Sequence, residues 1–474
     1  MRALIPLLLL VPAPAMAAGN FIESQTTLLE RLLSFTGIFV MVALAWMLSE
    51  NRGAIQWRPV IWGVVLQLVL GIIVLSPALS GFFFEVVDGG VRRLLSFSEA
   101  GANFVFQTTE MHQVDVMQGD PLVPVTQTFI GRISPPVKTF AFWILPTIIF
   151  FSSLMSILYH LGIMQRVVSV LAWVMQRTMG VSGAESLSAA ANIFVGQTEA
   201  PLVIKPFIEK MTRSELHAVM TGGFATVAGG VMAAYVGFLK DIPGIAGHLV
   251  TASIMSAPAA LAISKVMLPE TVKSATAGGA SIIVPRSDGN VIEAAARGAQ
   301  EGVKLAINVA AMLVAFVGLI AMVDWGLTWV PVGFCADGVT MGWFLEGCEP
   351  LSMSMILGWI FSPIAFSMGV PWAEAGVVGT LLGEKIVLTE FIAYIHLGDL
   401  INASTPVLSQ RSAIIASYAL CGFANFASIG IQLGGIGGIA PSRMGELAEL
   451  GLRAMIGGSL AAFMTGTIAG ILIG

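Results

Sequence analysis

The chain has 474 residues, of which 56% are hydrophobic and only 11% are charged, and its formal net charge is −5. Soluble proteins carry about 25% charged residues, so this composition predicts a polytopic membrane protein. No stretch gathers Lys and Arg on one face, which argues against nucleic-acid binding. The three cysteines and five histidines are scattered, without the spacing of a zinc site or of a disulfide framework.

The first residues have the layout of a secretory signal peptide. Arg2 precedes an apolar run from Ala3 to Val11, and Ala15-Met16-Ala17 offers a small-residue cleavage site. The run is too short to cross the ~30 Å hydrocarbon core of a bilayer. We expect residues 1–17 to be removed, which leaves the mature N-terminus outside. An uncleaved anchor is the alternative.

Residues 18–160 are predicted to form an N-terminal part with three spans. The loop after the first span carries Arg52 and Arg58, so the positive-inside rule places it in the cytoplasm. Charged residues among short apolar patches over 85–137 indicate an extracytoplasmic excursion of surface helix and loop. The three spans are expected at residues 32–49, 59–84 and 140–159.

Residues 161–268 read as one block of four segments. Apolar residues at helical spacing over 163–179 predict an amphipathic helix on the membrane face. A weak, broken segment over 184–213 follows, and each of its halves is too short to cross, so we expect a re-entrant hairpin. A glycine-rich span over 217–239, unwound in the middle, and an ordinary span over 247–268 complete the block.

Residues 269–350 are predicted to contain a cytoplasmic loop, a scaffold span and an external loop. The loop covers 269–303 and the span covers 305–329. Residues 331–350 are acidic and lack Lys and Arg, which places them outside the cell. There, Cys335 and Cys348 could form a disulfide in an oxidising compartment, with two free thiols as the alternative.

Residues 351–474 repeat the order of the first block: an interfacial segment, a hairpin over 373–402, a glycine-broken span and an ordinary span. Gly223-Phe224-Ala225-Thr226 matches Gly422-Phe423-Ala424-Asn425, and each broken segment carries one glutamate. An odd number of crossings separates the blocks, so they have opposite topology. Inverted repeats with discontinuous helices are typical of secondary transporters, which bind polar solutes near the bilayer midplane.

Glu199 and Glu390 are the glutamates of the two hairpins. A carboxylate at the bilayer centre costs about 2.5–3.5 kcal/mol, so each is a functional candidate that could accept hydrogen bonds from a solute. The alternative is a structural ion pair with Lys205 or Lys385. Uncharged donors and acceptors at the same depth suit a neutral hydroxylated or heterocyclic solute, and they are Asn192, Gln197, Thr198, Thr226, Asn425 and Ser428.

Three ordered motifs resemble the concentrative nucleoside transporter family, and the likeness covers nearly all of residues 32–474. They are Gly196-Gln197-Thr198-Glu199-Ala200-Pro201-Leu202, then Gly383-x-Lys385-x-x-x-Thr389-Glu390-Phe391-Ile392-Ala393-Tyr394, then Cys421-Gly422-Phe423-Ala424-Asn425 with Ser428 and Gly430. The resemblance implies an all-α polytopic membrane protein with eight transmembrane helices, two re-entrant hairpins in an inverted repeat, interfacial helices and a homotrimeric assembly.

The resemblance also implies roles for individual residues. The family's base-binding positions match Gln197, Thr198 and Glu199, with Val231 and Phe423 alongside. Its ribose-binding positions match Glu390, Asn425 and Ser428. Its sodium site matches Asn192, Thr226 and the backbone carbonyls of Val195 and Val227. One departure is Thr389, where the family usually has Asn, so an amide beside the substrate glutamate is missing.

We therefore expect a sodium-coupled nucleoside importer of a bacterial inner membrane, with sodium as coupling ion and no other cofactor. The alternatives are proton coupling through Glu199 or Glu390, and symport of another neutral polar solute. A membrane enzyme acting on a lipid-linked substrate, with the two glutamates as acid and base, is a third hypothesis. The inverted repeat and the lack of a metal-type Asp cluster argue against an enzyme.

Overall fold

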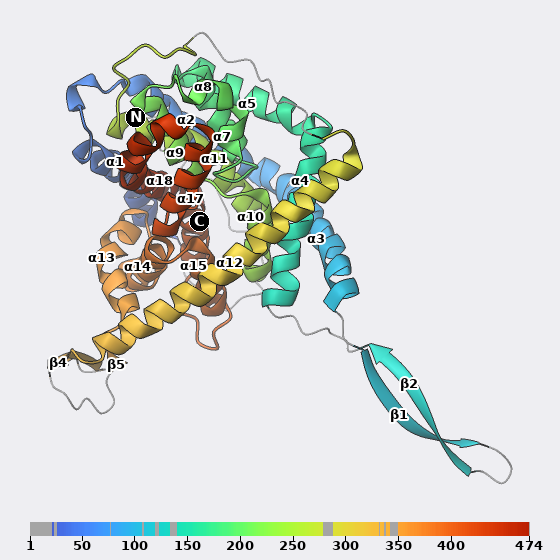
Figure 1. The fold of residues 1–474 in the computed structure, drawn as a ribbon. Helices are drawn as coiled ribbons and strands as arrows, with labels where there is room; N and C mark the ends of the chain where they lie inside the picture. The colour runs from blue at the N-terminus through green and yellow to red at the C-terminus, as the bar shows by residue number, and fades with distance from the viewer. Residues whose placement is uncertain are drawn as a thin grey trace.

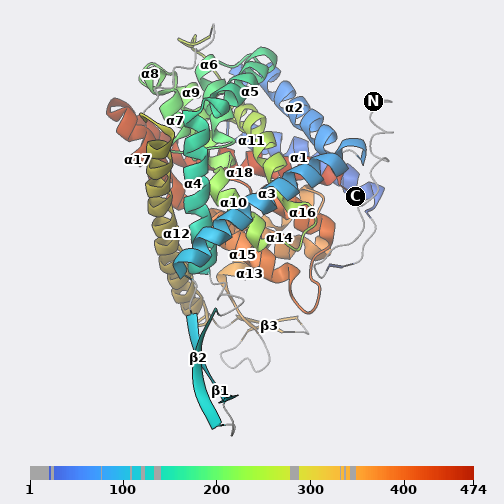
Figure 2. The same cartoon turned by 90° about the vertical axis from the view of Figure 1, so that its right-hand side faces the viewer.

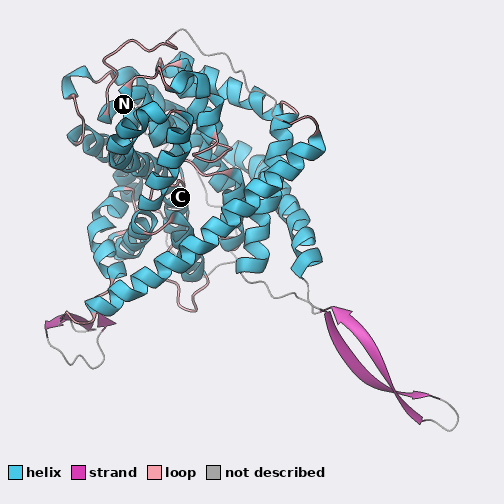
Figure 3. Cartoon of the chain, in the orientation of Figure 1, coloured by secondary structure: helices cyan, strands magenta, loops and turns pink. Residues whose placement is uncertain are grey.

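The structure is a computed structural model, and it is nearly all helical (Figure 3). The predicted signal peptide, residues 1–17, and Cys348 of the predicted disulfide lie outside the described residues. The described residues are 21–22, 26–75, 77–106, 109–118, 123–132, 140–277, 288–330, 332–335, 338–341 and 349–473.

The N-terminal part consists of four long helices and one β-hairpin. Strands β1 (Thr109–Gln118) and β2 (Val123–Arg132) pair antiparallel and project away from the helices (Figure 1). A short 3-10 turn at Arg52–Ala54 separates the first two helices, and a π-helical turn at Phe140–Ile144 leads into the fourth. The helices are α1 (Leu28–Met47), α2 (Trp57–Leu75), α3 (Pro77–Phe106) and α4 (Leu145–His160).

The first block follows the predicted order. Its interfacial helix lies between two left-handed glycines, Gly162 and Gly180, and has the predicted bounds. The next helix stops at Asn192, and the broken span is interrupted over 226–228. The helices are α5 (Ile163–Met179), α6 (Gly183–Asn192), α7 (Ala200–Val203), α8 (Lys205–Ile208), α9 (Arg213–Ala225), α10 (Gly229–Phe238) and α11 (Ile245–Met267).

Helix α12 (Val291–Leu327) connects the blocks and runs obliquely across the other helices (Figure 1). Its 37 residues extend over about 55 Å, well beyond the ~30 Å of a hydrocarbon core. It begins within the predicted cytoplasmic loop, because Asn290 caps its first turn by accepting from Glu293 N. A small antiparallel sheet follows, made of β3 (Val332–Cys335), β4 (Gly338–Met341) and β5 (Glu349–Pro350).

The second block again has the predicted order. A two-residue break, Leu388 and Thr389, separates the arms of its hairpin, and residues 421–425 interrupt its broken span. A 3-10 turn at Pro441–Arg443 precedes the last helix. The helices are α13 (Met353–Ser367), α14 (Trp372–Val387), α15 (Glu390–Ile401), α16 (Gln410–Leu420), α17 (Phe426–Ile439) and α18 (Met444–Leu472).

Among the described residues, six segments are long and apolar enough to cross a membrane, and the number rises to eight if two bent pairs each count as one span. The pairs are α4–α5, bent by 79°, and α13–α14, bent by 117°. The predicted eight spans count α4 and the broken pair α16–α17 besides the six. Burial places the last helix at the centre, since 94% of its apolar window is buried, against 6% for α12.

A buried glutamate anchors the first arm of each hairpin. Glu185, the third residue of α6, pairs with Lys265 of α11, which also donates to Ser214 Oγ at 2.9 Å. Glu374, the third residue of α14, accepts from both N and Oγ of Ser409 at 2.9 Å. Buried charges need such partners because they have lost their water. These contacts fix the base of each hairpin, and the fixed base holds the hairpin tip in place.

The two broken spans meet at their breaks. Gly422 has φ +119°, a backbone conformation that favours glycine. A Cβ at this position would lie 2.6 Å from the carbonyl oxygen of Phe224 and 2.7 Å from that of Ala225. The close approach of the two interrupted helices therefore depends on the absence of a side chain at position 422.

We expect Gly422→Ala to lower the melting temperature of the detergent-purified protein. The left-handed backbone alone costs about 1–3 kcal/mol for a residue with a side chain, and the overlap with two carbonyl oxygens adds to it. The matched control is Gly430→Ala in the neighbouring helix, where a new Cβ meets nothing within 4 Å. Equal melting temperatures for the two variants would show that the helices can separate without cost.

Two sequence predictions in the N-terminal part differ from the structure. The second span ends at Leu75 instead of residue 84, because Pro77 disfavours helix at the residue before it and starts a new helix. Over 85–137, helix α3 extends to Phe106, and the β1–β2 hairpin that follows it was not predicted. Val114 and Val116 alternate with polar residues at a period of two, which is a strand signal within a segment interpreted as loop.

Candidate binding site

The tip of the first hairpin is an irregular turn closed by its own glutamate. Helix α6 ends at Asn192, and helical structure resumes at Ala200, so the backbone between them is free of a helical ladder. Gly196 N donates to Glu199 Oε2 at 3.0 Å, and Glu199 N donates to Gly196 O at 3.1 Å. Glu199 Oε1 has no hydrogen-bond partner among the described residues and remains available as an acceptor.

The tip of the second hairpin presents Glu390 at the first turn of α15. Its carboxylate accepts from Tyr235 Oη and from Asn425 Nδ2, each at 2.9 Å. Asn425 in turn accepts from Ser428 N at 2.8 Å and caps α17. A carboxylate has about four lone-pair sites, so two remain for a ligand's hydroxyl groups. The positive end of the α17 dipole also favours a carboxylate here.

Thr389, the residue that departs from the family pattern, has a local role. Its Oγ1 accepts from Ile392 N at 3.4 Å and caps the first turn of α15. Threonine and asparagine both serve as helix caps, so the hairpin tip keeps its cap despite the substitution.

The eight predicted substrate residues come together around one cavity of about 310 Å³, which we call the tip cavity. This volume suits a small organic ligand. Both hairpin tips, α10 and the α16–α17 break contribute to its wall. The predicted residues that line it are Gln197, Thr198, Glu199, Val231, Glu390, Phe423, Asn425 and Ser428.

Sequence reasoning missed the contribution of the scaffold helix to this wall. Asn308 and Leu313 of α12 line the tip cavity, as does Ser152 of α4. Asn308 could have been recognised as a candidate site residue, because it is a polar residue within an apolar span. Tyr235 was missed as well, because nothing near it in the sequence indicates that its partner, Glu390, lies 155 positions away.

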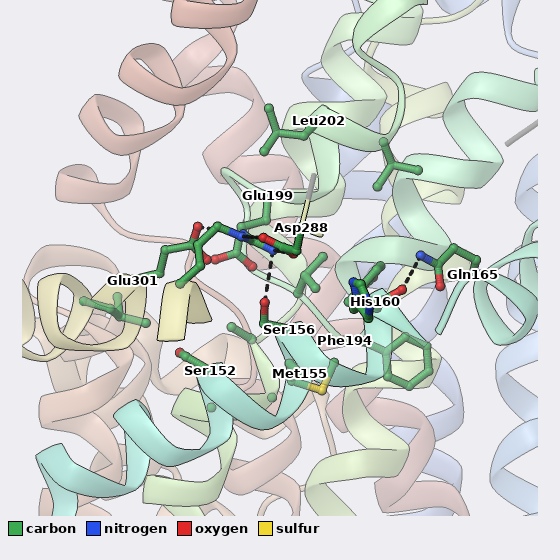
Figure 4. Close-up of a pocket in the computed structure, with 18 of the residues that line it drawn as sticks. Ser152, Met155, Ser156, His160, Gln165, Phe194, Glu199, Leu202, Asp288 and Glu301 are labelled. Atoms are coloured by element: carbon green, nitrogen blue, oxygen red, sulfur yellow. Dashed lines mark hydrogen bonds and ion pairs between the residues drawn. The ribbon is translucent and has the colours of Figure 1, made fainter. Parts of the chain in front are cut away.

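A second cavity of about 370 Å³, which we call the side cavity, adjoins the first (Figure 4). Glu199, Ser152 and Glu301 line both cavities, so Glu199 stands at their boundary. Arg297 crosses the side cavity and binds Asp288 at 2.8 Å and Glu301 at 2.9 Å. On its other side the cavity is lined by Gln165 of α5 and Lys205 of α8.

The residues predicted to hold a cation lie where α6 ends and α9 is interrupted. Asn192 is 1% exposed, and neither Oδ1 nor Nδ2 has a hydrogen-bond partner among the described residues. Thr226 Oγ1 donates to Gly222 O at 2.9 Å, and a Cβ at Gly222 would lie 3.6 Å from Asn192 Nδ2, so both side chains lie beside Gly222. A buried orphan amide costs about 1–3 kcal/mol, which a bound ion could offset.

Val195 and Val227 lie in the two irregular segments, where carbonyl groups are released from the helical ladder. Helix ends of this kind coordinate cations in secondary transporters. The oxygen donors of this region, a side-chain amide, a hydroxyl and two carbonyls, fit a small hard cation such as sodium.

Among the described residues, no salt bridge within 4 Å joins Glu199 or Glu390 to Lys205 or Lys385. Lys385 is fully buried and donates to the carbonyl oxygens of Ala419 at 2.8 Å and Cys421 at 3.2 Å, at the end of α16. Lys205 is exposed, lines the side cavity and forms no ion pair with the described residues. Lys385 therefore caps a broken helix, and Glu390 faces the cavity.

Comparisons with known families cover most of the chain. Residues 36–109 match the family described as Na+ dependent nucleoside transporter N-terminus. Residues 141–241 match the one described as Nucleoside recognition, and residues 248–470 match Na+ dependent nucleoside transporter C-terminus.

Individual proteins are similar along 94% of the chain. Solute carrier family 28 member 3 of Mus musculus is 40% identical over 456 residues, and Sodium/nucleoside cotransporter 1 of Homo sapiens is 40% identical over 455 residues. The chain spans 59% and 64% of the lengths of these two relatives. The solved structure of CNTnw in an inward-facing substrate-bound state is 39% identical, with a TM-score of 0.79, and the match covers 98% of that chain.

Proposed function

Because the chain belongs to the family of sodium-dependent, concentrative nucleoside transporters, we propose that it imports nucleosides by symport with sodium. The observation that carries this proposal is the tip cavity, which gathers both hairpin glutamates and six further predicted contacts around one space. An acidic solute is disfavoured, since two carboxylates face the cavity and a third would be repelled.

Each end of the tip cavity is proposed to bind one half of the nucleoside. Glu390, Asn425 and Ser428 would bind the ribose, whose hydroxyls donate to the open lone pairs of Glu390. Gln197, Thr198 and Glu199 would bind the base, with Val231 and Phe423 packing against its faces. Binding therefore requires sugar and base in one molecule.

We expect nucleosides to compete for uptake while free bases and free ribose do not. The measurement is inhibition of labelled uridine uptake by uridine, uracil and ribose at equal concentration, with and without sodium. A free base lacks the ribose hydroxyls, so it cannot form the charge-assisted hydrogen bonds to Glu390. Equal inhibition by uracil and by uridine would contradict the two-part site.

Sodium is proposed to bind through Asn192, Thr226 and the carbonyls of Val195 and Val227, immediately behind the first hairpin tip. An inward cation gains about 2.3 kcal/mol per 100 mV of membrane potential. Because the same tip carries Gln197 and Glu199, a bound cation would order the base-binding side chains. That shared element would couple the ion to the solute.

The two blocks, 161–268 and 351–474, are proposed to form an inverted repeat that moves as a transport domain. The scaffold would consist of residues 18–160 and 269–350. Support for the assembly comes from α12, because only 6% of its apolar window is buried within one chain. That surface fits a homotrimeric assembly embedded in lipid, which native mass spectrometry of the purified protein tests. A monomer at all concentrations would contradict it.

The protein is proposed to lie in a bacterial inner membrane with its N-terminus in the periplasm. Arg52 lies in the turn between α1 and α2. Arg58, in the first turn of α2, donates to the carbonyl oxygens of Thr178 and Arg177 at the end of α5. These cations would mark the cytoplasmic face. A cysteine introduced at Asn51 should then add labelling, relative to the unmodified protein, only with membrane-permeant reagents; added labelling of intact cells by an impermeant reagent would reverse the topology.

A further inference from the structure

Gln432 of α17 lies beside the tip cavity but was not among the predicted site residues. Its side chain is fully buried, and its Nε2 donates to two acceptors, Gln197 Oε1 at 3.0 Å and the carbonyl oxygen of Met220 at 3.1 Å. Its Oε1 has no hydrogen-bond partner among the described residues. The buried amide therefore makes its contacts through the NH2 group.

These contacts fix the orientation of two amides. A backbone carbonyl can only accept, so the atom of Gln432 that faces Met220 must be the nitrogen. The same nitrogen contacts Gln197, and two NH2 groups cannot bond each other, so Gln197 turns its oxygen toward Gln432. The NH2 group of Gln197 then points the other way, toward the tip cavity that Gln197 lines.

The contact between the two glutamines is built into the packing. Gly223 of α9 lies against both, and a Cβ there would be 2.8 Å from Gln432 Nε2 and 3.0 Å from Gln197 Cβ. The missing side chain allows the hairpin tip, α9 and α17 to meet at this point. Gln432 thus holds Gln197 from outside the cavity.

We propose that Gln432 is a positioning residue that makes Gln197 a hydrogen-bond donor to a carbonyl oxygen of the nucleobase. This inference rests on the proposed function. Glu199 accepts at the same tip, so the site presents one donor and one acceptor side by side. The imide edge of uracil, a carbonyl next to an N–H, matches that pair.

The test compares uridine with 2-thiouridine and 4-thiouridine, in which sulfur, a weak acceptor, replaces one carbonyl oxygen. For the unmodified protein we expect one of the two analogues to need about three- to tenfold more nucleoside for half-maximal uptake. In Gln432→Met, which has similar volume but no NH2, Gln197 is free to turn. The half-maximal concentration of that analogue should then be less than about twice that of uridine.

A second variant, Gln432→Glu, has the same shape but at most one donor hydrogen, which the carbonyl oxygen of Met220 would take, so it could only accept from Gln197. This variant would draw the NH2 group of Gln197 away from the cavity, so uridine should bind more weakly than in Gln432→Met. The thio analogue and uridine should again have similar half-maximal concentrations. The matched control is Gln67→Met in α2, because Gln67 is also fully buried but bonds only Gly63 O of its own helix. This control should keep the ratio of the unmodified protein.

The outcomes separate the inference from the proposed function. No uridine uptake by the unmodified protein would refute the function itself. Uridine uptake with no penalty for either thio analogue would overturn the inference without any variant. A variant that weakens uridine and the thio analogue by the same factor would give Gln432 a structural role only.

Discussion

Replacing Glu390 by glutamine is expected to reduce nucleoside uptake at least about 100-fold while the protein still folds. Asn425 must donate to residue 390, because its own oxygen is occupied by Ser428 N. The new amide would therefore turn its oxygen toward Asn425 and its NH2 toward Tyr235 and the ribose. One acceptor becomes a donor and the charge is lost, which together cost about 3 kcal/mol or more.

The matched control for this variant is Glu384→Gln in the other arm of the same hairpin. Glu384 is also buried, but it pairs with His396 at 3.0 Å and does not line the tip cavity. It should retain most of the uptake. Folding of both variants is checked by membrane yield and by size-exclusion elution. Normal transport by Glu390→Gln would remove Glu390 from the binding site.

Replacing Asn192 by leucine is expected to raise the sodium concentration for half-maximal uptake at least about tenfold. The substitution keeps the volume but removes the only oxygen that the side chain offers to a cation. Tenfold corresponds to about 1.4 kcal/mol, within the cost of leaving one polar contact unmade. The measurement is uridine uptake as a function of external sodium.

Asn402→Leu controls for the loss of an amide in a hairpin. Asn402 follows α15, is exposed, and donates to Gly398 O of its own helix at 2.9 Å. Its sodium dependence should match that of the unmodified protein. If Asn192→Leu also kept the original sodium dependence, the cation would bind elsewhere and the orphan amide would have a different partner.

Sequence patterns sufficed for the hairpins and the breaks because the bilayer restricts the possibilities. Apolar runs of half the spanning length on both sides of a polar segment cannot each cross the bilayer. Residues 184–213 could therefore be interpreted as a re-entrant turn. The match of Gly223 with Gly422 then predicted that the two broken spans correspond. In the structure, Gly422 packs against the backbone of Phe224, beside Gly223.

The contacts between distant segments could not be predicted in this way. Tyr235 and Gln432 act on the site through hydrogen bonds to Glu390 and Gln197, and nothing local in their sequence marks those partners. The length of α12 was underestimated, because its first turns are polar and resemble a loop until Asn290 is seen to cap them. Such contacts are determined by tertiary packing, which local sequence patterns do not reveal.

Thr389 illustrates how a departure from a family pattern changes meaning once the geometry is known. The sequence suggested a missing amide beside Glu390. The structure gives its hydroxyl a backbone partner, Ile392 N, so the residue serves the helix start. Thr389 also lines the tip cavity, together with Glu390 and Phe391 of the same hairpin, so the residue that caps the helix lies beside the ligand space as well.

The most direct test of the account is uridine uptake by the purified protein in liposomes. With sodium outside and none inside, we predict accumulation of unchanged uridine above its external concentration, and an inside-negative potential should increase it. With equal sodium on both sides and no potential, uptake should stop at equilibrium. Accumulation that follows a pH gradient and ignores sodium would contradict sodium coupling, and no accumulation under any gradient would contradict symport.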